Sequence, residues 1–152
     1  MSVDVLTEIV ISVARDEVAA YAADPDRAPE WYVNIDSVRW QTPGPVRIGS
    51  RVTFVARFLG RTLEYTYELT EFDPGRKLVM RTAEGPFPME TTYTWESTPS
   101  GDTRMTLRNR GEPSGFSAVA APFMAMAMRR ANRNDLAKLK SILESRSKDR
   151  QR

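Results

Sequence analysis

The chain has 152 residues, of which 41% are hydrophobic and 28% charged, and its formal net charge is +2. These values are typical of one globular domain that can bury a core without metals or disulfides, and the small net charge disfavours a nucleic-acid-binding protein. The chain contains no histidine and no cysteine, so it lacks the side chains that most often serve as nucleophiles, metal ligands and acid–base groups at neutral pH.

No segment approaches the roughly 20 apolar residues that span a bilayer. The first residues carry Asp4 and Glu8 and no basic region, which argues against a signal peptide. We therefore expect a cytoplasmic protein without a cofactor, either a monomer or a weak homodimer.

Residues 3–13 alternate between apolar and polar side chains, apart from Val10, and predict an opening strand. Residues 15–21 are rich in helix-forming residues and predict a short helix. Asp24 followed by Pro25 is a typical helix start and predicts a second short helix that ends near Trp31.

The two-residue period then returns and is interrupted by turn residues. It predicts six further strands, near residues 35–40, 51–58, 62–70, 77–82, 89–96 and 104–110. Each strand has one apolar and one polar face, which is typical of antiparallel sheets. The short connections favour a meander topology.

After residue 115 the apolar spacing changes to three and four, which predicts a long helix over residues 117–145. Basic residues gather near its end. We interpret them as a solvated helix end rather than as a patch that binds an anionic surface. Residues 1–146 are expected to form a single domain and residues 147–152 a frayed basic tail.

Five local motifs carry a resemblance that spans nearly the whole chain. They are ADPDRAPEW (23–31), GPVRIGSRVTF (44–54), LTEFDPGRKLVMR (69–81), GDTRMTL (101–107) and DLAKLKSILE (135–144). In this order the chain resembles the START-related (SRPBCC) helix-grip superfamily, which includes pollen-allergen-like proteins, polyketide cyclases/dehydrases and lipid-transport domains. Asp102 interrupts the glycine–threonine pair of the fourth motif, at a turn position where little should depend on it.

The resemblance implies an α+β fold. A curved, seven-stranded antiparallel sheet would grip the long C-terminal helix, with two short helices between the first and second strands. It also implies an internal cavity for a hydrophobic small molecule. It does not fix an activity, because one fold hosts many functions.

The candidate ligand-binding residues are those that the periodicity turns inward, together with Trp31 near the expected entrance. They are Trp31, Phe54, Phe58, Tyr65, Tyr67, Tyr93, Trp95, Met105, Leu107, Asn109, Phe123, Met124, Met128 and Asn132. Aromatic walls with a few polar groups suit a ligand pocket, and methionine adapts to varied apolar guests. Periodicity alone favours the alternative that these residues fill a solid core, and Trp31 is better interpreted as a packing anchor than as a gate.

The inward tyrosines and asparagines either orient a polar group of the ligand or satisfy one another, and the sequence leaves both possibilities open. Arg81 could point inward, where it would hold an anionic group, but we favour a side chain that points into solvent because charges are rarely buried unpaired. The glutamates at positions 64, 68, 90 and 96 fall on the outer face, so no catalytic set of residues is identified.

The leading hypothesis is therefore the binding or transfer of a lipid-, polyketide- or quinone-like molecule in an internal cavity. The first alternative is an enzyme of the polyketide cyclase, aromatase or dehydratase type, in which tyrosines polarise a carbonyl group. The second alternative is a protein-interaction module that uses an exposed apolar patch or the basic exterior of the last helix.

Overall fold

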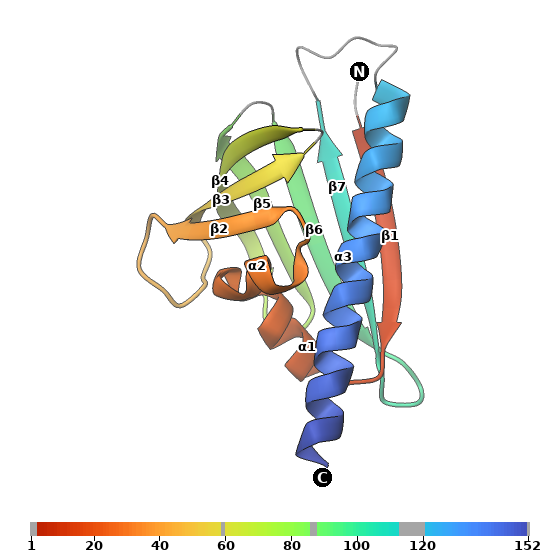
Figure 1. Ribbon diagram of the computed structural model, residues 1–152. Coiled ribbons are helices and arrows are strands. Elements are labelled where there is room, and N and C mark those ends of the chain that lie inside the picture. Colours follow the sequence, from red (N-terminus) through yellow and green to blue (C-terminus); the bar gives the residue numbers. More distant parts are fainter. Residues whose placement is uncertain (1–2, 59, 86–87, 113–120, 152) are drawn as a thin grey trace.

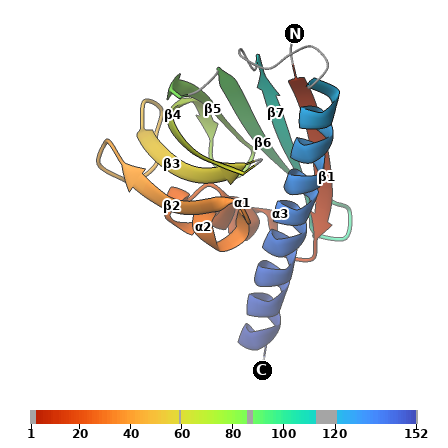
Figure 2. The same ribbon diagram turned by 45° about the horizontal axis from the view of Figure 1, so that its top comes forward.

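A single antiparallel sheet curves around the first half of a long helix in the computed structural model, which describes residues 3–58, 60–85, 88–112 and 121–151 (Figures 1 and 2). The strands are β1 (Val3–Ile11), β2 (Ile35–Trp40), β3 (Arg51–Phe58), β4 (Arg61–Asp73), β5 (Lys77–Glu84), β6 (Met89–Ser97) and β7 (Thr103–Gly111). The helical segments are α1 (Arg15–Ala22), the 3-10 turn η1 (Pro25–Arg27), α2 (Ala28–Trp31) and α3 (Ala121–Arg150). This arrangement confirms the predicted helix-grip fold.

The strand order across the sheet is β1-β7-β6-β5-β4-β3-β2, so β1 pairs with β7 and the rest form a meander. The pairing of β4 with β5 shifts in register between Thr66 and Tyr67 and again between Leu69 and Glu71. Such irregularities bend a strand and increase its twist. They help the long strand β4 to curve, and the curvature leaves room between the sheet and α3.

The helical turn η1 begins at Asp24 and Pro25, as the sequence predicts. The side chain of Asp24 accepts a hydrogen bond from the backbone amide of Asp26 at 3.0 Å, and Pro25 occupies the first position of η1. The expected second helix is divided into η1 and α2, and it ends at Trp31. Figure 1 shows α1 and α2 near the end of the sheet where α3 finishes.

The main core lies beneath the second half of α3. Leu136, Leu139 and Leu143 are almost fully buried there and belong to one cluster with Val18 and Trp31. A second, smaller cluster lies under the first half of α3 and contains the buried residues Val3, Val5, Tyr65, Met124 and Met128. The interior is therefore divided along α3 into a larger and a smaller apolar region.

The last helix ends later than its apolar pattern predicts, at Arg150 rather than near residue 145, and the predicted start at residue 117 lies outside the described residues. Contacts with α1 explain the extension. Arg150 forms an ion pair with Glu17, and the guanidinium group of Arg146 lies 5.1 Å from the ring centre of Tyr21. Residues 147–150 thus continue α3. Within the described residues, no helix is long and apolar enough to cross a membrane.

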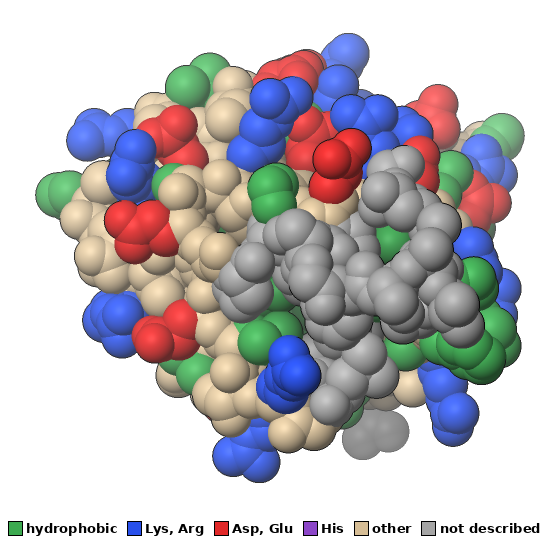
Figure 3. Space-filling view, turned by 90° about the horizontal axis from the view of Figure 1, so that it is seen from above, with side chains coloured by type: hydrophobic (Ala, Val, Ile, Leu, Met, Phe, Trp, Pro, Cys, Tyr) green, Lys and Arg blue, Asp and Glu red, His purple; other side chains and the backbone are tan. Residues whose placement is uncertain are grey.

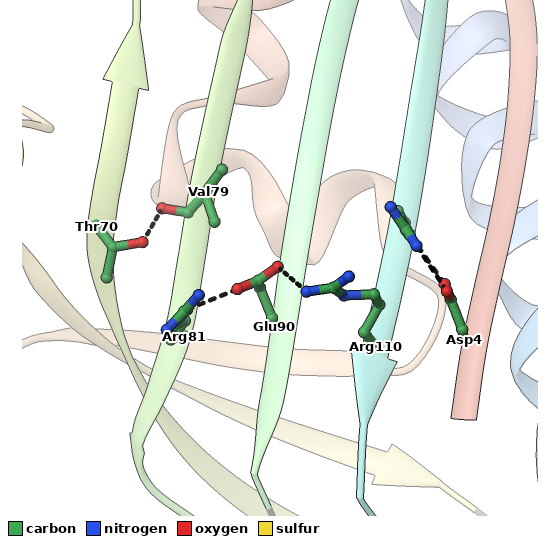
Figure 4. A network of polar contacts seen from close by, with 7 residues as sticks. Asp4, Thr70, Val79, Arg81, Glu90 and Arg110 are labelled. Atoms are coloured by element: carbon green, nitrogen blue, oxygen red, sulfur yellow. Dashed lines mark hydrogen bonds and ion pairs between the residues drawn. The ribbon is translucent and has the colours of Figure 1, made fainter. Parts of the chain in front are cut away.

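The convex face of the sheet carries paired charges. Glu90 on β6 accepts hydrogen bonds from Arg81 on β5 at 2.6 Å and from Arg110 on β7 at 3.3 Å (Figure 4). Nearby, Arg108 binds Asp4 on β1. These contacts confirm that Arg81 and Glu90 point outward. Seen from the end where α3 begins, acidic and basic side chains lie next to one another on the surface (Figure 3).

Candidate functional site

A cavity of about 150 Å³ lies between the curved sheet and the first half of α3. Its lining is mainly aliphatic, aromatic and methionine side chains, with a few polar groups. The lining residues are Tyr32, Asn34, Ile35, Phe54, Ala56, Arg57, Leu63, Tyr65, Tyr67, Met80, Met89, Thr91, Asn109, Met124, Met128, Ala131, Asn132 and Asp135. Residues of both apolar clusters line it, and Tyr67 packs against both, so the cavity lies where the two clusters meet.

Seven of the residues predicted from the sequence meet in this cavity. They are Phe54, Tyr65, Tyr67, Asn109, Met124, Met128 and Asn132. The strand residues come from the inward faces of β3, β4 and β7, and the others recur every four residues along α3. The two- and four-residue periods are therefore sufficient to identify these walls.

Four other predicted residues, Trp31, Trp95, Met105 and Leu107, point inward but pack in the main core and do not line this cavity. Trp31 is fully buried, which agrees with its interpretation as a packing anchor. Tyr93 lies in the same core and borders a separate void of only about 20 Å³. The wider pocket expected from the sequence is thus confined to one end of the interior.

The prediction that Phe123 faces inward is wrong, because its side chain is 70% exposed. Successive helix positions are rotated by about 100°, so Phe123 and Met124 cannot both face the sheet, and Met124 takes the buried position. The side chain of Phe58 lies outside the described part of the structure.

Hydrogen bonds inside the protein engage several of the inward polar groups. The hydroxyls of Tyr32 and Tyr93 bond to each other, and Tyr67 bonds to Thr91. Thr91 in turn donates to the Asn109 side-chain oxygen at 2.8 Å. These bonds hold the polar groups of β4, β6 and β7 in fixed positions.

Burial keeps the tyrosines of the cavity protonated. Desolvation raises the pKa of Tyr65 to about 12, and it raises the pKa of Tyr32, Tyr67 and Tyr93 well above the usual value near 10. At neutral pH these phenols can donate or accept hydrogen bonds but cannot act as bases.

Asn132 differs from the other polar groups of the cavity. Its side chain is 5% exposed, and its amide nitrogen Nδ2 has no hydrogen-bond partner within the described part of the chain. The indole nitrogens of Trp31 and Trp95 also find no partner among the described residues, but those rings lie in the main core. A buried donor without an acceptor costs about 1–3 kcal/mol. Asn132 therefore lines the cavity and carries a buried donor that no described residue satisfies.

Asp135 is the functional candidate that the sequence analysis missed. It is 3% exposed, lines the cavity, and its Oδ1 accepts a hydrogen bond from the Val33 backbone amide at 2.9 Å. Burial raises the pKa of this carboxyl to about 6, although the Val33 amide and Lys138 act in the opposite direction. Asp135 lies seven residues after Met128 and three residues after Asn132, and this spacing places it on the inward face of the helix. The same spacing could have identified Asp135 as a lining residue from the sequence.

The remaining polar lining comes from the connection between α2 and β2 and from the end of β3. Asn34 and Arg57 lie there, and Arg57 is largely exposed and bonded to Asp36 at 2.8 Å. No periodic pattern marks a connection, so Tyr32 and Asn34 could not be predicted as lining residues. They lie on the side of the cavity where β2 forms the edge of the sheet.

The comparison with protein families agrees with this geometry. A family model described as "Polyketide cyclase / dehydrase and lipid transport" matches residues 2–144. The chain belongs to this family. No curated protein matches the chain. The match confirms the START-related resemblance that the sequence motifs carry.

Solved structures share the fold at low sequence identity. The protein TTHA0849 from Thermus thermophilus is 20% identical, with a TM-score of 0.82 over 95% of this chain and 99% of that one. The Zhui aromatase/cyclase from a Streptomyces species is 16% identical, with a TM-score of 0.82 over 97% and 96% of the two chains. A START superfamily protein from Mycobacterium smegmatis is 11% identical, with a TM-score of 0.81 over 93% and 97%. At these identities the similarity establishes the fold alone.

Proposed function

We propose that this protein binds a hydrophobic small molecule in the cavity beneath the first half of α3. The observation that carries the proposal is the cavity itself, whose walls are largely apolar and include Asn132, a side chain with a donor that no described residue satisfies. A dry, apolar cavity of about 150 Å³ in another protein accommodates benzene. The cavity is thus suited to one ring, or a short alkyl segment, of a lipid-, polyketide- or quinone-like ligand.

The methionines allow this proposal to be tested directly. Met80, Met89, Met124 and Met128 line the cavity, whereas Met105 is in the main core and Met126 is 63% exposed. We expect propylbenzene to shift the methyl NMR signals of the four lining methionines. The signals of Met105 and Met126 should move much less.

Two matched substitutions on α3 distinguish binding inside the cavity from binding at the surface. Met128→Trp adds volume inside the cavity and should weaken propylbenzene binding at least about tenfold, while Met126→Trp adds the same ring to the exposed face and should leave the affinity unchanged. Equal affinities in the two variants would contradict the proposed site.

An enzyme of the cyclase, aromatase or dehydratase type is the second candidate. It is favoured by the position of Asp135, whose pKa of about 6 suits proton transfer near neutral pH, beside Asn132 in one cavity. Of the tyrosines expected to polarise a carbonyl, Tyr67 and Tyr93 already have protein partners. Turnover of a synthetic poly-β-ketone that disappears in Asp135→Asn would support this candidate. Binding of the same compound without turnover would support simple ligand binding.

A further inference from the structure

We propose that Asn132 and Asp135 select neutral, hydroxyl-bearing ligands and exclude ligands that carry a carboxylate. The proposal rests on the proposed function, because it specifies which hydrophobic molecules the same cavity accepts. The selectivity concerns the polar group of the ligand. The apolar walls of the cavity limit only the size of the ligand's hydrocarbon part.

The two side chains present complementary hydrogen-bonding groups to one region of the cavity. They are three residues apart on α3 and therefore lie on the same face of the helix. Nδ2 of Asn132 is a donor without an acceptor among the described residues. The Asp135 carboxylate, when ionised, only accepts, and Val33 is the single donor to it in the described part of the chain.

A hydroxyl group satisfies both requirements at once, because it has one donor hydrogen and two acceptor lone pairs. It can accept from Nδ2 of Asn132 and donate to Asp135. An ammonium group could donate to Asp135 but has no lone pair for Asn132. A ketone could accept from Asn132 but would give nothing to Asp135. Among these simple groups, the hydroxyl matches the pair best.

A carboxylate is disfavoured because it would place a second negative charge beside Asp135. Within the described part of the chain, the ionisable groups that act electrostatically on Asp135 are Tyr32, Tyr93 and Lys138, and both tyrosines stay neutral. Arg57, the basic side chain in the lining, is bonded to Asp36 and mostly exposed. The charge of Asp135 is therefore poorly balanced, and a ligand anion would be repelled across a short distance in a poorly screened interior.

Three ligands with the same tail test the proposal. Propylbenzene, 4-propylphenol and 4-propylbenzoate would be titrated at pH 8 and followed through the methyl signals of Met124 and Met128. We expect the phenol to bind at least about tenfold more tightly than propylbenzene, and the benzoate at least about tenfold more weakly. At pH 5, where Asp135 is largely protonated given its pKa of about 6, the preference for the phenol over the benzoate should narrow.

Two variants show which of the two side chains is responsible for each ligand preference. Asp135→Asn should reduce the phenol-to-benzoate affinity ratio at pH 8 at least about tenfold. The ratio should then change less with pH than in the unaltered protein, because only the ligand's own carboxylate still titrates. Asn132→Leu should reduce the preference for the phenol over propylbenzene without abolishing propylbenzene binding. Asp149→Asn, an exposed change on the same helix, is the control and should leave every ratio unchanged.

The outcomes separate this proposal from the one on which it rests. If propylbenzene shifts the lining methionines but the phenol and the benzoate bind equally well, the selectivity proposal is overturned and the binding function stands. The same conclusion follows if the ratio does not change with pH in the unaltered protein, a measurement that needs no variant to fold. If none of the three ligands shifts a lining methionine, both proposals are contradicted.

Discussion

The Asp135 carboxylate accepts a hydrogen bond from the backbone amide of Val33 at 2.9 Å, which ties α3 to the residues that follow α2. The same carboxylate lines the cavity and is almost fully buried. Because the pKa of Asp135 is about 6 in the folded protein against an ordinary value of 3.8, keeping this group ionised costs stability. Residues that reduce stability while facing a cavity are typical of functional sites.

The first prediction concerns Asp135 and pH. Between about pH 4 and pH 6 the folded state binds more protons than the unfolded state, so the free energy of unfolding falls as the pH rises through this window. A rise from 3.8 to about 6 corresponds to about 3 kcal/mol. Asp135→Asn keeps an oxygen for the Val33 amide and removes the charge. We expect it to stabilise the protein by about 2–3 kcal/mol at pH 8 and by little at pH 4.

Urea denaturation of both proteins at pH 4 and pH 8 measures this difference. A variant that is less stable than the unaltered protein at pH 8 would contradict this prediction. It would show that the hydrogen bond to the carboxylate stabilises the protein by more than the burial of the charge destabilises it.

The second prediction concerns the solid half of the interior. Leu139 is fully buried in the main core beneath α3, so Leu139→Ala should lower the free energy of unfolding by about 2–5 kcal/mol. Met126→Ala, on the exposed side of the same helix, should change it by less than about 0.5 kcal/mol. Thermal unfolding followed by circular dichroism compares the two, and similar losses would contradict the described orientation of α3.

The third prediction concerns the hydrogen bond between the hydroxyls of Tyr32 and Tyr93. Tyr93→Phe leaves the Tyr32 hydroxyl without this partner, and we expect a loss of about 1–2 kcal/mol in stability. The double variant with Tyr32→Phe removes both hydroxyls and should lose no more than either single variant. Additive losses in denaturant unfolding would show that the two hydroxyls do not interact.

The fourth prediction concerns the outer face, where Glu90 lies between Arg81 and Arg110 (Figure 4). Glu90→Gln should destabilise the protein by about 1 kcal/mol at low salt, and the loss should shrink at 1 M salt because exposed pairs are screened. Glu96→Gln, an exposed change on the same strand, is the control. A loss that does not depend on salt would indicate that Glu90 acts through packing rather than charge.

The sequence predicts the fold well because each strand and the last helix repeat a simple period. The alternation in β1 identifies Val3, Val5 and Ile11 as buried, and the four-residue spacing in α3 identifies Met124 and Met128. The apolar pattern places the end of α3 too early, because the last turns of this helix are held by polar contacts with α1 rather than by an apolar stripe.

The cavity is harder to predict, because a period gives the direction of a side chain and not what lies opposite it. Met105 and Met128 both face inward, yet one packs against core residues and the other borders open space. Asp135 escapes a prediction from sequence since a charged residue on a helix is normally assigned to solvent. Only the curvature of the sheet, which depends on tertiary contacts, shows that its position faces the cavity.

A crystal structure of the protein saturated with propylbenzene would show whether the cavity holds an apolar ligand. We expect one ring in the space bordered by Phe54, Tyr67 and Met128, with the surrounding side chains close to their described positions. A structure in which these side chains have closed the space, with propylbenzene bound only at the surface, would contradict it.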